Sequence, residues 1–217
     1  MKEDIFKFWS QLELGQKVHP ADADVLRHTR HHFELACLPS PYGGRLLTAQ
    51  VVLLFLNPGF SKPDLTAARS LSGRKHCLEK LKGRSDFPDE LEHPNALKWL
   101  KSRTKFLGDW ENIRRRVAIL ELCPYHSKEF KDQALLAALP SVRKMLEWAQ
   151  EQLFVDAIKR RRIVICMRSP KFWGLQAGKR RGFLFAPETN RGGFALKECE
   201  IANAATRTVN RLVLSAV

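Results

Sequence analysis

The stretch Ala49-Gln50-Val51-Val52-Leu53-Leu54-Phe55-Leu56, followed directly by Asn57-Pro58-Gly59, decides the fold class. Its apolar run is continuous rather than alternating, which is typical of a strand covered on both faces. Proline cannot continue a central ladder of backbone hydrogen bonds, so Pro58 marks the end of the strand. A strand of this kind indicates the interior of a sheet with helices packed on each side.

Three further segments have the same form, and amphipathic helical patterns alternate with them. The additional strands are predicted at residues 117–122, 163–167 and, more weakly, 182–186, each with a proline soon after its end. Apolar residues at steps of three and four predict helices near the N-terminus, over 142–153 and over 201–213. This order predicts an α/β protein: a three-layer α/β/α sandwich with a central, mostly parallel four-stranded sheet. Residues 1–217 are expected to form one domain, with a helical extension over residues 1–35.

The apolar runs and the cysteines of the chain indicate in which cellular compartment the protein is expected. The 217 residues contain no apolar run near the ~20 needed to cross a bilayer, and the N-terminus lacks the pattern of a signal peptide. The five cysteines form no C-x-x-C pair, which argues against a disulfide framework or a cysteine-rich zinc site. We therefore expect a cytoplasmic protein without a membrane partner, and we favour a monomer.

The net charge of +14 points toward a polyanionic partner. Much of the excess lies in three clusters in the second half of the chain, at residues 114–116, 159–162 and 179–181. Such clusters attract phosphates and release counterions on binding. Solvated loop ends are the alternative explanation for any one cluster. Three together favour a polyanionic partner.

Polar side chains follow the predicted strands. In open α/β sheets, ligands bind outside the carboxyl ends of the strands, and here those ends carry Asn57, Tyr125, His126, Arg168 and Asn190. Gly59 lets a ligand approach the backbone closely. Asn-Pro-Gly is also a common turn sequence, so the tripeptide alone does not establish a site.

The segment Leu-Phe-Leu-Asn57-Pro58-Gly59-Phe60-Ser61 resembles the first motif of the uracil-DNA glycosylase superfamily, particularly its mismatch-specific and single-strand-selective branches. Residues 38–44, Leu-Pro-Ser-Pro-Tyr-Gly-Gly, are similar to the loop that leads into that strand in related proteins. The order of elements over roughly residues 38–213 is similar as well. The first motif is the specific part of this likeness.

The resemblance implies an enzyme that flips a damaged or mismatched base into a pocket and hydrolyses its N-glycosidic bond. Asn57 would orient the attacking water, and backbone N–H groups near Gly59 and Phe60 would hold a base carbonyl. Phe60 or Tyr42 would stack on the base. The resemblance implies nucleic acid as the partner, with DNA favoured over RNA, and no metal or cofactor. The residues expected to bind the base are Tyr42, Pro58, Gly59, Phe60, Cys123, Tyr125, His126 and Asn190, and those expected to grip the nucleic-acid backbone are Arg168, Lys171, Lys179, Arg180, Arg181 and Arg191.

Two positions depart from the family pattern. Cys123 stands where the family often has an asparagine that reads the base, and a thiol lacks the paired donor and acceptor of an amide. Ala186-Pro187 stands where a histidine or asparagine usually opens the last motif, although Asn190 and Arg191 are near enough in sequence to compensate. These departures keep open a non-catalytic protein of the same fold that binds nucleic acid or a nucleotide. A binding protein for a small anionic ligand is the third alternative.

Other candidate sites are weaker. His28 and His32 would share a face of a helix as zinc ligands do, but the neighbouring arginines disfavour a cation. Cys123 with His126 lacks an orienting acid for a thiol nucleophile. Trp173 is either a base-stacking surface residue or a buried anchor.

An acid within a predicted strand is unusual. Glu121 has apolar neighbours, so it must be paired or lie at an exposed edge. It is either a general base or a structural partner of Arg168, and the sequence favours the partner.

Overall fold

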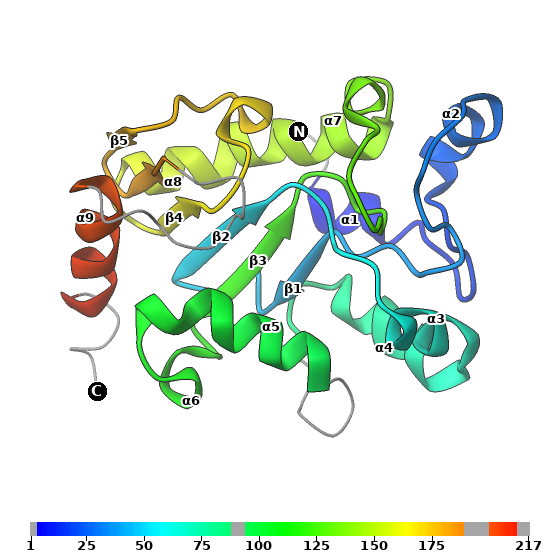
Figure 1. Cartoon of the computed structure of the whole chain (residues 1–217), viewed down its shortest axis with the longest axis horizontal. Helices are drawn as coiled ribbons and strands as arrows, with labels where there is room; N and C mark the ends of the chain where they lie inside the picture. The colour runs from blue at the N-terminus through cyan, green and yellow to red at the C-terminus, as the bar shows by residue number, and fades with distance from the viewer. Residues whose placement is uncertain (1–3, 88–93, 189–199, 212–217) are drawn as a thin grey trace.

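Among the described residues, which are 4–87, 94–188 and 200–211, the computed structural model contains six strands in one sheet (Figure 1). Their order across the sheet is β1-β3-β2-β4-β6-β5. The strands are β1 (Tyr42–Gly44), β2 (Val51–Phe55), β3 (Val117–Glu121), β4 (Ile163–Cys166), β5 (Lys179–Arg181) and β6 (Leu184–Ala186). The α/β class is therefore as predicted.

The pairing differs from the prediction at both edges. β2 runs parallel to β3 and β4, and β4 runs parallel to β6. The added strands β1 and β5 are antiparallel to their neighbours, so the prediction of a four-stranded sheet is wrong and the sheet is mixed. Each added strand has three residues, and β5 consists of three exposed basic residues. Short and charged edge strands carry no apolar pattern, which is why the sequence did not reveal them.

Helices cover both faces of the sheet (Figure 1). On one face, α5, α6 and α9 pack against the odd-numbered residues of β2 and β3. On the other, α1, α7 and α8 pack against the even-numbered residues, and α3 and α4 lie beside β1. The helices are α1 (Ile5–Trp9), α2 (Ala23–His28), α3 (Lys62–Arg69), α4 (Leu71–Lys80), α5 (Pro94–Thr104), α6 (Trp110–Ile113), α7 (Pro140–Trp148), α8 (Phe154–Ile158) and α9 (Glu200–Val209). The alternation along each strand thus builds two cores, one on each side.

The N-terminal segment belongs to the main core. Ile5 and Trp9 of α1 are fully buried against α7 and its neighbours. Asp22, which is also fully buried, accepts hydrogen bonds from the Tyr125 hydroxyl at 2.5 Å and the Ser141 amide at 2.9 Å. This network fixes the predicted extension to the sheet.

Two further expectations can be placed. Trp173 is fully buried and its indole N–H donates to the Phe55 carbonyl at 3.2 Å, so it is an anchor rather than a stacking surface. The four described cysteines, Cys37, Cys77, Cys123 and Cys166, are buried free thiols, whereas Cys199 lies outside the described residues. No helix in the described ranges has the length and apolar character needed to cross a bilayer.

Candidate ligand pocket

A cavity of about 400 Å³ opens where β2 and β3 end. Its walls come from the loop after β2, from α3 and α4 beside β1, and from α5 on the front of the sheet. The apolar walls include Phe60, Phe87, Trp99 and Ile119, and the polar lining includes Asp64, Lys80, Glu121 and His126. This volume, with apolar walls and a few converging polar groups, is characteristic of a small-molecule site.

The two loops that close the sheet side of the pocket are bonded to each other. Phe60 N–H donates to the Ser127 carbonyl at 3.2 Å, and Ser127 N–H donates to the Pro58 carbonyl at 3.3 Å. The His126 Nδ1 donates to the Gly59 carbonyl at 2.7 Å. These bonds extend the parallel pairing of β2 and β3 beyond the strands. The predicted use of the Phe60 amide as a donor to a base is therefore wrong, because Ser127 already occupies it.

Gly59 leaves open space beside the loop. A Cβ built on Gly59 meets no atom within 4 Å, and its φ lies outside the left-handed region. The backbone therefore does not need glycine here for its conformation. Gly59 also lines the cavity, so the missing side chain leaves the backbone open to approach on that side.

Asn57 is turned toward the loop rather than into the pocket. Its amide nitrogen donates to the Ser127 hydroxyl at 2.8 Å, the Pro58 carbonyl at 2.9 Å and, more weakly, the Tyr125 carbonyl at 3.4 Å. Carbonyl oxygens only accept, so the nitrogen must face them. Pro58 and Gly59 line the cavity, but Asn57 is not among its lining residues. The carbonyl oxygen of its amide stays available as an acceptor.

Glu121 is the buried acid of the pocket. It is the last residue of β3, shares a face with Ile119, and is only 6 % exposed. Its Oε2 is buried and has no hydrogen-bond partner among the described residues. Burial raises the pKa of Glu121 from its ordinary value of 4.5 to about 8, although Arg168 and Lys80 oppose the rise. Arg168, the expected partner of Glu121, attracts the carboxylate from a distance and does not donate a hydrogen bond to this oxygen.

His126 and Lys80 complete the polar lining. Burial lowers the pKa of His126, against the opposing effects of Asp64 and the Gly59 carbonyl, so a neutral imidazole is favoured. Its Nδ1 lies 3.6 Å from the Asp64 carboxylate. The Lys80 ammonium donates to the Ser40 hydroxyl at 2.9 Å. Of the predicted ligand-reading groups, His126 is therefore placed at the pocket.

Three other predicted base-binding residues serve the core. Tyr125 is 2 % exposed, and its hydroxyl is bonded to Asp22 on the opposite face of the sheet. Cys123 is fully buried in the same core, so it cannot contact a base in the pocket. Burial also raises the pKa of its thiol, which makes it a poor nucleophile. Tyr42 touches the cavity but is 1 % exposed, and its hydroxyl donates to the Leu81 carbonyl. Neither Tyr42 nor Tyr125 is therefore free to stack on a base, whereas Phe60 and Trp99 line the cavity.

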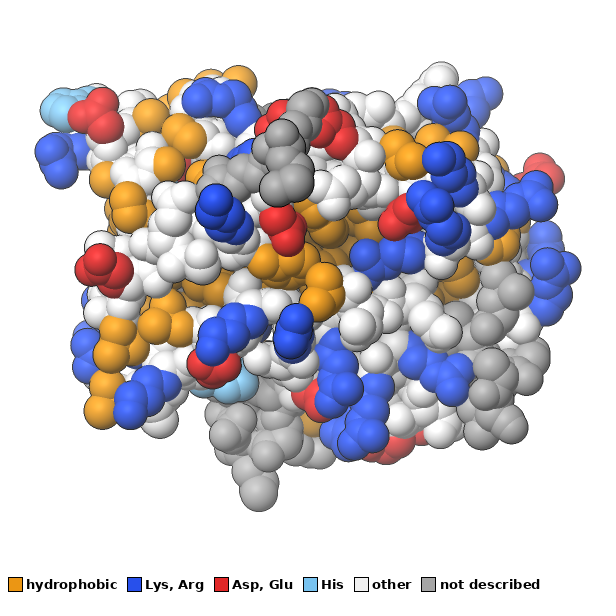
Figure 2. Space-filling view, turned by 180° about the vertical axis from the view of Figure 1, so that it is seen from behind, with side chains coloured by type: hydrophobic (Ala, Val, Ile, Leu, Met, Phe, Trp, Pro, Cys, Tyr) orange, Lys and Arg blue, Asp and Glu red, His pale blue; other side chains and the backbone are white. Residues whose placement is uncertain are grey.

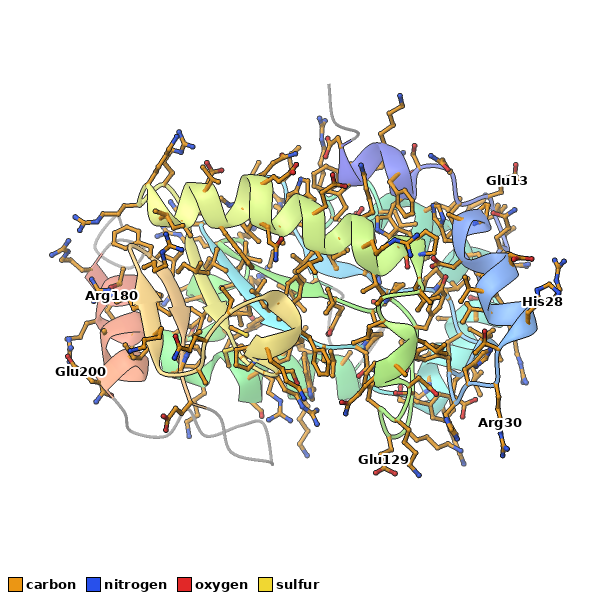
Figure 3. All side chains as sticks on the ribbon, turned by 90° about the horizontal axis from the view of Figure 1, so that it is seen from above. Glu13, His28, Arg30, Glu129, Arg180 and Glu200 are labelled. Atoms are coloured by element: carbon orange, nitrogen blue, oxygen red, sulfur yellow. The ribbon has the colours of Figure 1, made fainter. Side chains whose placement is uncertain are left out.

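The basic residues are distributed differently from the prediction. Lys179, Arg180 and Arg181 form β5, which lies four strand spacings, about 19 Å, from β3. Figure 3 shows Arg180 at one end of the molecule, far from Glu129 in the loop after β3. The clusters at 114–116 and 159–162 precede β3 and β4, so they lie at the amino ends of the strands, opposite the pocket. Lysine and arginine side chains are scattered over the rear face among acidic ones (Figure 2).

Positive charge near the pocket comes from other residues. The Lys128 ammonium lies 5.3 Å from the Phe60 ring centroid, and the Arg103 guanidinium lies 5.4 Å from that of Trp99. Arg168 follows β4 and is exposed, whereas Lys171 stands over the ring of Phe172 at 4.7 Å. Asn190 and Arg191 lie outside the described residues.

The sequence analysis did not predict the pocket residues Asp64, Lys80 and Trp99. These residues lie on the helices α3, α4 and α5, whereas the prediction considered only the segments that follow the strands.

The histidines near the N-terminus do not form the zinc pair considered from the sequence. His28 ends α2, while His32 lies beyond the helix and bonds to the Asp132 carboxylate at 2.9 Å. Within the described ranges, no group of three or more histidine, cysteine or acidic side chains is arranged to hold a metal ion.

No protein-family profile, curated protein or solved structure matches the chain.

Proposed function

We propose that this protein binds DNA, takes one extruded base into the pocket at the ends of β2 and β3, and hydrolyses the N-glycosidic bond of that base. The observation that carries the proposal is the pairing of aromatic walls with a buried acid in a cavity of about 400 Å³. A flat heterocycle fits between apolar walls and needs polar partners on its edge. The likeness of residues 54–61 to the first motif of the uracil-DNA glycosylase superfamily adds to this.

Nucleic acid is supported as the carrier of the base by the rim of the pocket. Phe60 and Trp99 both line the cavity, and each has a cation, Lys128 or Arg103, close to its ring. Aromatic rings beside cations are the composition with which proteins stack bases and neutralise phosphates. Lys128, Arg103 and Arg168 are better placed for phosphate contacts than the basic residues of β5.

Hydrolysis would proceed with Asn57 as the residue that orients water. Its amide nitrogen is held by the two loops, so its carbonyl oxygen would accept a hydrogen bond from water beside the sugar. The water oxygen bonds to the anomeric carbon as the bond from that carbon to the base breaks. The bonding electrons leave with the base, which takes up a proton, and the sugar keeps a hydroxyl group.

A second candidate is a protein of the same architecture that binds nucleic acid or a nucleotide without cleaving it. The position of Asn57 favours it, because the side chain is not among the pocket residues and its amide group bridges two loops. In this case Asn57 stabilises the loop that carries Phe60 and has no contact with the reacting atoms.

The test is an assay for abasic sites. Single- and double-stranded oligonucleotides carrying uracil, hypoxanthine or mismatched thymine are incubated with the protein and then treated to cleave abasic positions. Cleavage that Asn57→Ala abolishes and Ser127→Ala preserves supports hydrolysis, because Ser127→Ala removes a loop bond of Asn57 but leaves its carbonyl. Salt-sensitive binding without abasic sites supports the second candidate. Absence of binding at low salt contradicts both.

A further inference from the structure

We infer that Glu121 determines which ligands the pocket accepts: its carboxyl group donates one hydrogen bond to the edge of the bound base and accepts another from it. This inference rests on the proposed base-binding function of the pocket. The resemblance to the glycosylase superfamily assigns no role to Glu121.

The first support is position. Glu121 ends β3 at the floor of the cavity, on the same side of the sheet as Ile119 and facing α5. It is more than nine-tenths buried. Phe60 and Trp99 line the same cavity as Glu121, so a flat ring stacked on either of them shares that space with the carboxyl group. A group there contacts the ligand without exposure to bulk water, where a hydrogen bond discriminates most strongly.

The second support is the unmet hydrogen bond. Oε2 of Glu121 is buried without a partner, and leaving such an atom unbonded is costly. Arg168 and Lys80 act on Glu121 through longer-range attraction, and neither they nor any other described residue donates a hydrogen bond to this oxygen. The Lys80 ammonium donates to the Ser40 hydroxyl at 2.9 Å. The partner that satisfies Glu121 is therefore expected to come from outside the chain.

The third support is chemical form. Because burial raises the pKa of Glu121 to about 8, the neutral acid predominates at pH 7. A neutral carboxyl group has one donor and one acceptor side by side, which matches the adjacent acceptor and donor on a pyrimidine or purine edge. It supplies the paired contacts of an amide, which Cys123 cannot.

The charged and titratable groups around the site set the expected pH response. Arg168 after β4 and Lys80 on α4 lower the pKa of Glu121. The remaining titratable side chains of the lining are Tyr42, Asp64, His76, Cys77 and His126. Of these, His126 is shifted toward the neutral form by burial, so it stays neutral as the pH rises above 7. Ligand binding is therefore expected to weaken above neutral pH because the Glu121 carboxyl group loses its proton.

The experiment measures binding of free cytosine to the whole protein by calorimetry, because cytosine does not titrate between pH 6 and 9. Affinity should fall about tenfold from pH 6 to pH 9, as the neutral fraction of Glu121 falls. Glu121→Gln keeps a donor and an acceptor, so it should retain binding and lose the pH dependence. Glu121→Met should weaken binding about tenfold or more at pH 6. Glu129→Gln, in the exposed loop after β3, is the control that should change neither quantity.

The outcomes separate this inference from the proposed function. Binding of cytosine that depends on Glu121, without abasic sites in any oligonucleotide, supports the inference and contradicts hydrolysis. Abasic sites formed equally well by wild type and a folded Glu121→Met variant overturn the inference and leave hydrolysis standing. Loss of binding in Glu121→Gln would show that the ionised carboxylate is the active form, and absence of cytosine binding to the wild type would remove the role altogether. Thermal unfolding of each variant shows whether it is folded.

Discussion

Two buried carboxyl groups, Asp22 and Glu121, lie on opposite faces of the sheet and have different surroundings. Asp22 is fully buried, and each of its two oxygens accepts a hydrogen bond, one from Tyr125 and one from Ser141. Glu121 is nearly as buried, but its Oε2 has no partner and its side chain lines a cavity. A satisfied buried acid holds a fold together, whereas an unsatisfied one at a cavity is a candidate for contact with a ligand.

The same short segment supplies both environments. From the end of β3 through Ser127, Glu121 and His126 line the pocket, while Cys123 and Tyr125 enter the core behind the sheet. Side chains that line the pocket and side chains that enter the core are therefore interleaved within a few residues. The predictions below test this division, beginning with the largest expected effect.

Removing the satisfied acid should cost the most stability. Asp22→Ala leaves the Tyr125 hydroxyl and the Ser141 amide without their acceptor in the core. We expect the free energy of unfolding to fall by about 3 kcal/mol, measured by urea denaturation at pH 7. Cytosine affinity of the folded fraction should not change. A loss below about 1 kcal/mol would contradict the structural role given to this network.

Replacing the unsatisfied acid should change how stability depends on pH. The folded-state pKa of Glu121 is raised to about 8 from 4.5, so the folded protein binds a proton that the unfolded chain has lost in this interval. The contribution of this group is therefore fully present below about pH 4.5 and is lost as the pH rises to about 8.

Glu121→Gln removes that dependence. Relative to wild type, the variant should gain about 2 to 3 kcal/mol in free energy of unfolding between about pH 5.5 and about pH 7.5. Parallel urea titrations at these pH values measure the difference. A gap that stays constant with pH would mean that Glu121 is ionised in the folded protein.

Filling the open space beside the loop should affect binding but not folding. In Gly59→Ala the new methyl meets no protein atom, so stability should be unchanged or higher by up to about 1 kcal/mol. Because the methyl enters the cavity next to Phe60, affinity for cytosine should fall about tenfold, or about 1.4 kcal/mol. Calorimetry and thermal unfolding test both parts. Unchanged affinity would place the ligand elsewhere.

The smallest effects should come from the distant basic residues. Replacing Lys179, Arg180 and Arg181 together by glutamine should change the salt dependence of oligonucleotide binding less than Lys128→Gln alone. Loss of one phosphate contact at Lys128 should reduce the slope of log affinity against log salt by about 0.7 to 0.9. A larger change in the triple variant would assign the nucleic-acid surface to β5 instead.

The sequence predicted the α/β class, the four strands that pair in parallel and the helix between β3 and β4, because continuous apolar runs and helical stripes are local signals. It did not predict β1 and β5, whose short edge segments lack such a pattern. At the site, Gly59, Phe60 and His126 were correctly expected beside a cavity. Tyr125 and Cys123 were misplaced, because a loop sequence does not reveal to which face of the sheet each side chain turns.

Glu121 was visible in the sequence as an acid inside an apolar strand, but its surroundings were not. Whether such an acid is paired depends on helices distant in sequence, here α4 with Lys80 and α5 with Trp99. Arg168 was expected as its structural partner, yet it acts on Glu121 only through longer-range attraction. Contacts between elements of this kind come from packing and are not encoded in any one segment.

The most direct test is a titration of the Glu121 carboxyl carbon by NMR, with and without saturating cytosine. A base that bonds to the neutral acid must stabilise that form, so the titration midpoint should lie near pH 8 in the free protein and move upward when cytosine binds. A midpoint near the ordinary 4.5, or one that cytosine leaves unmoved, would contradict the assignment of this buried acid to the ligand.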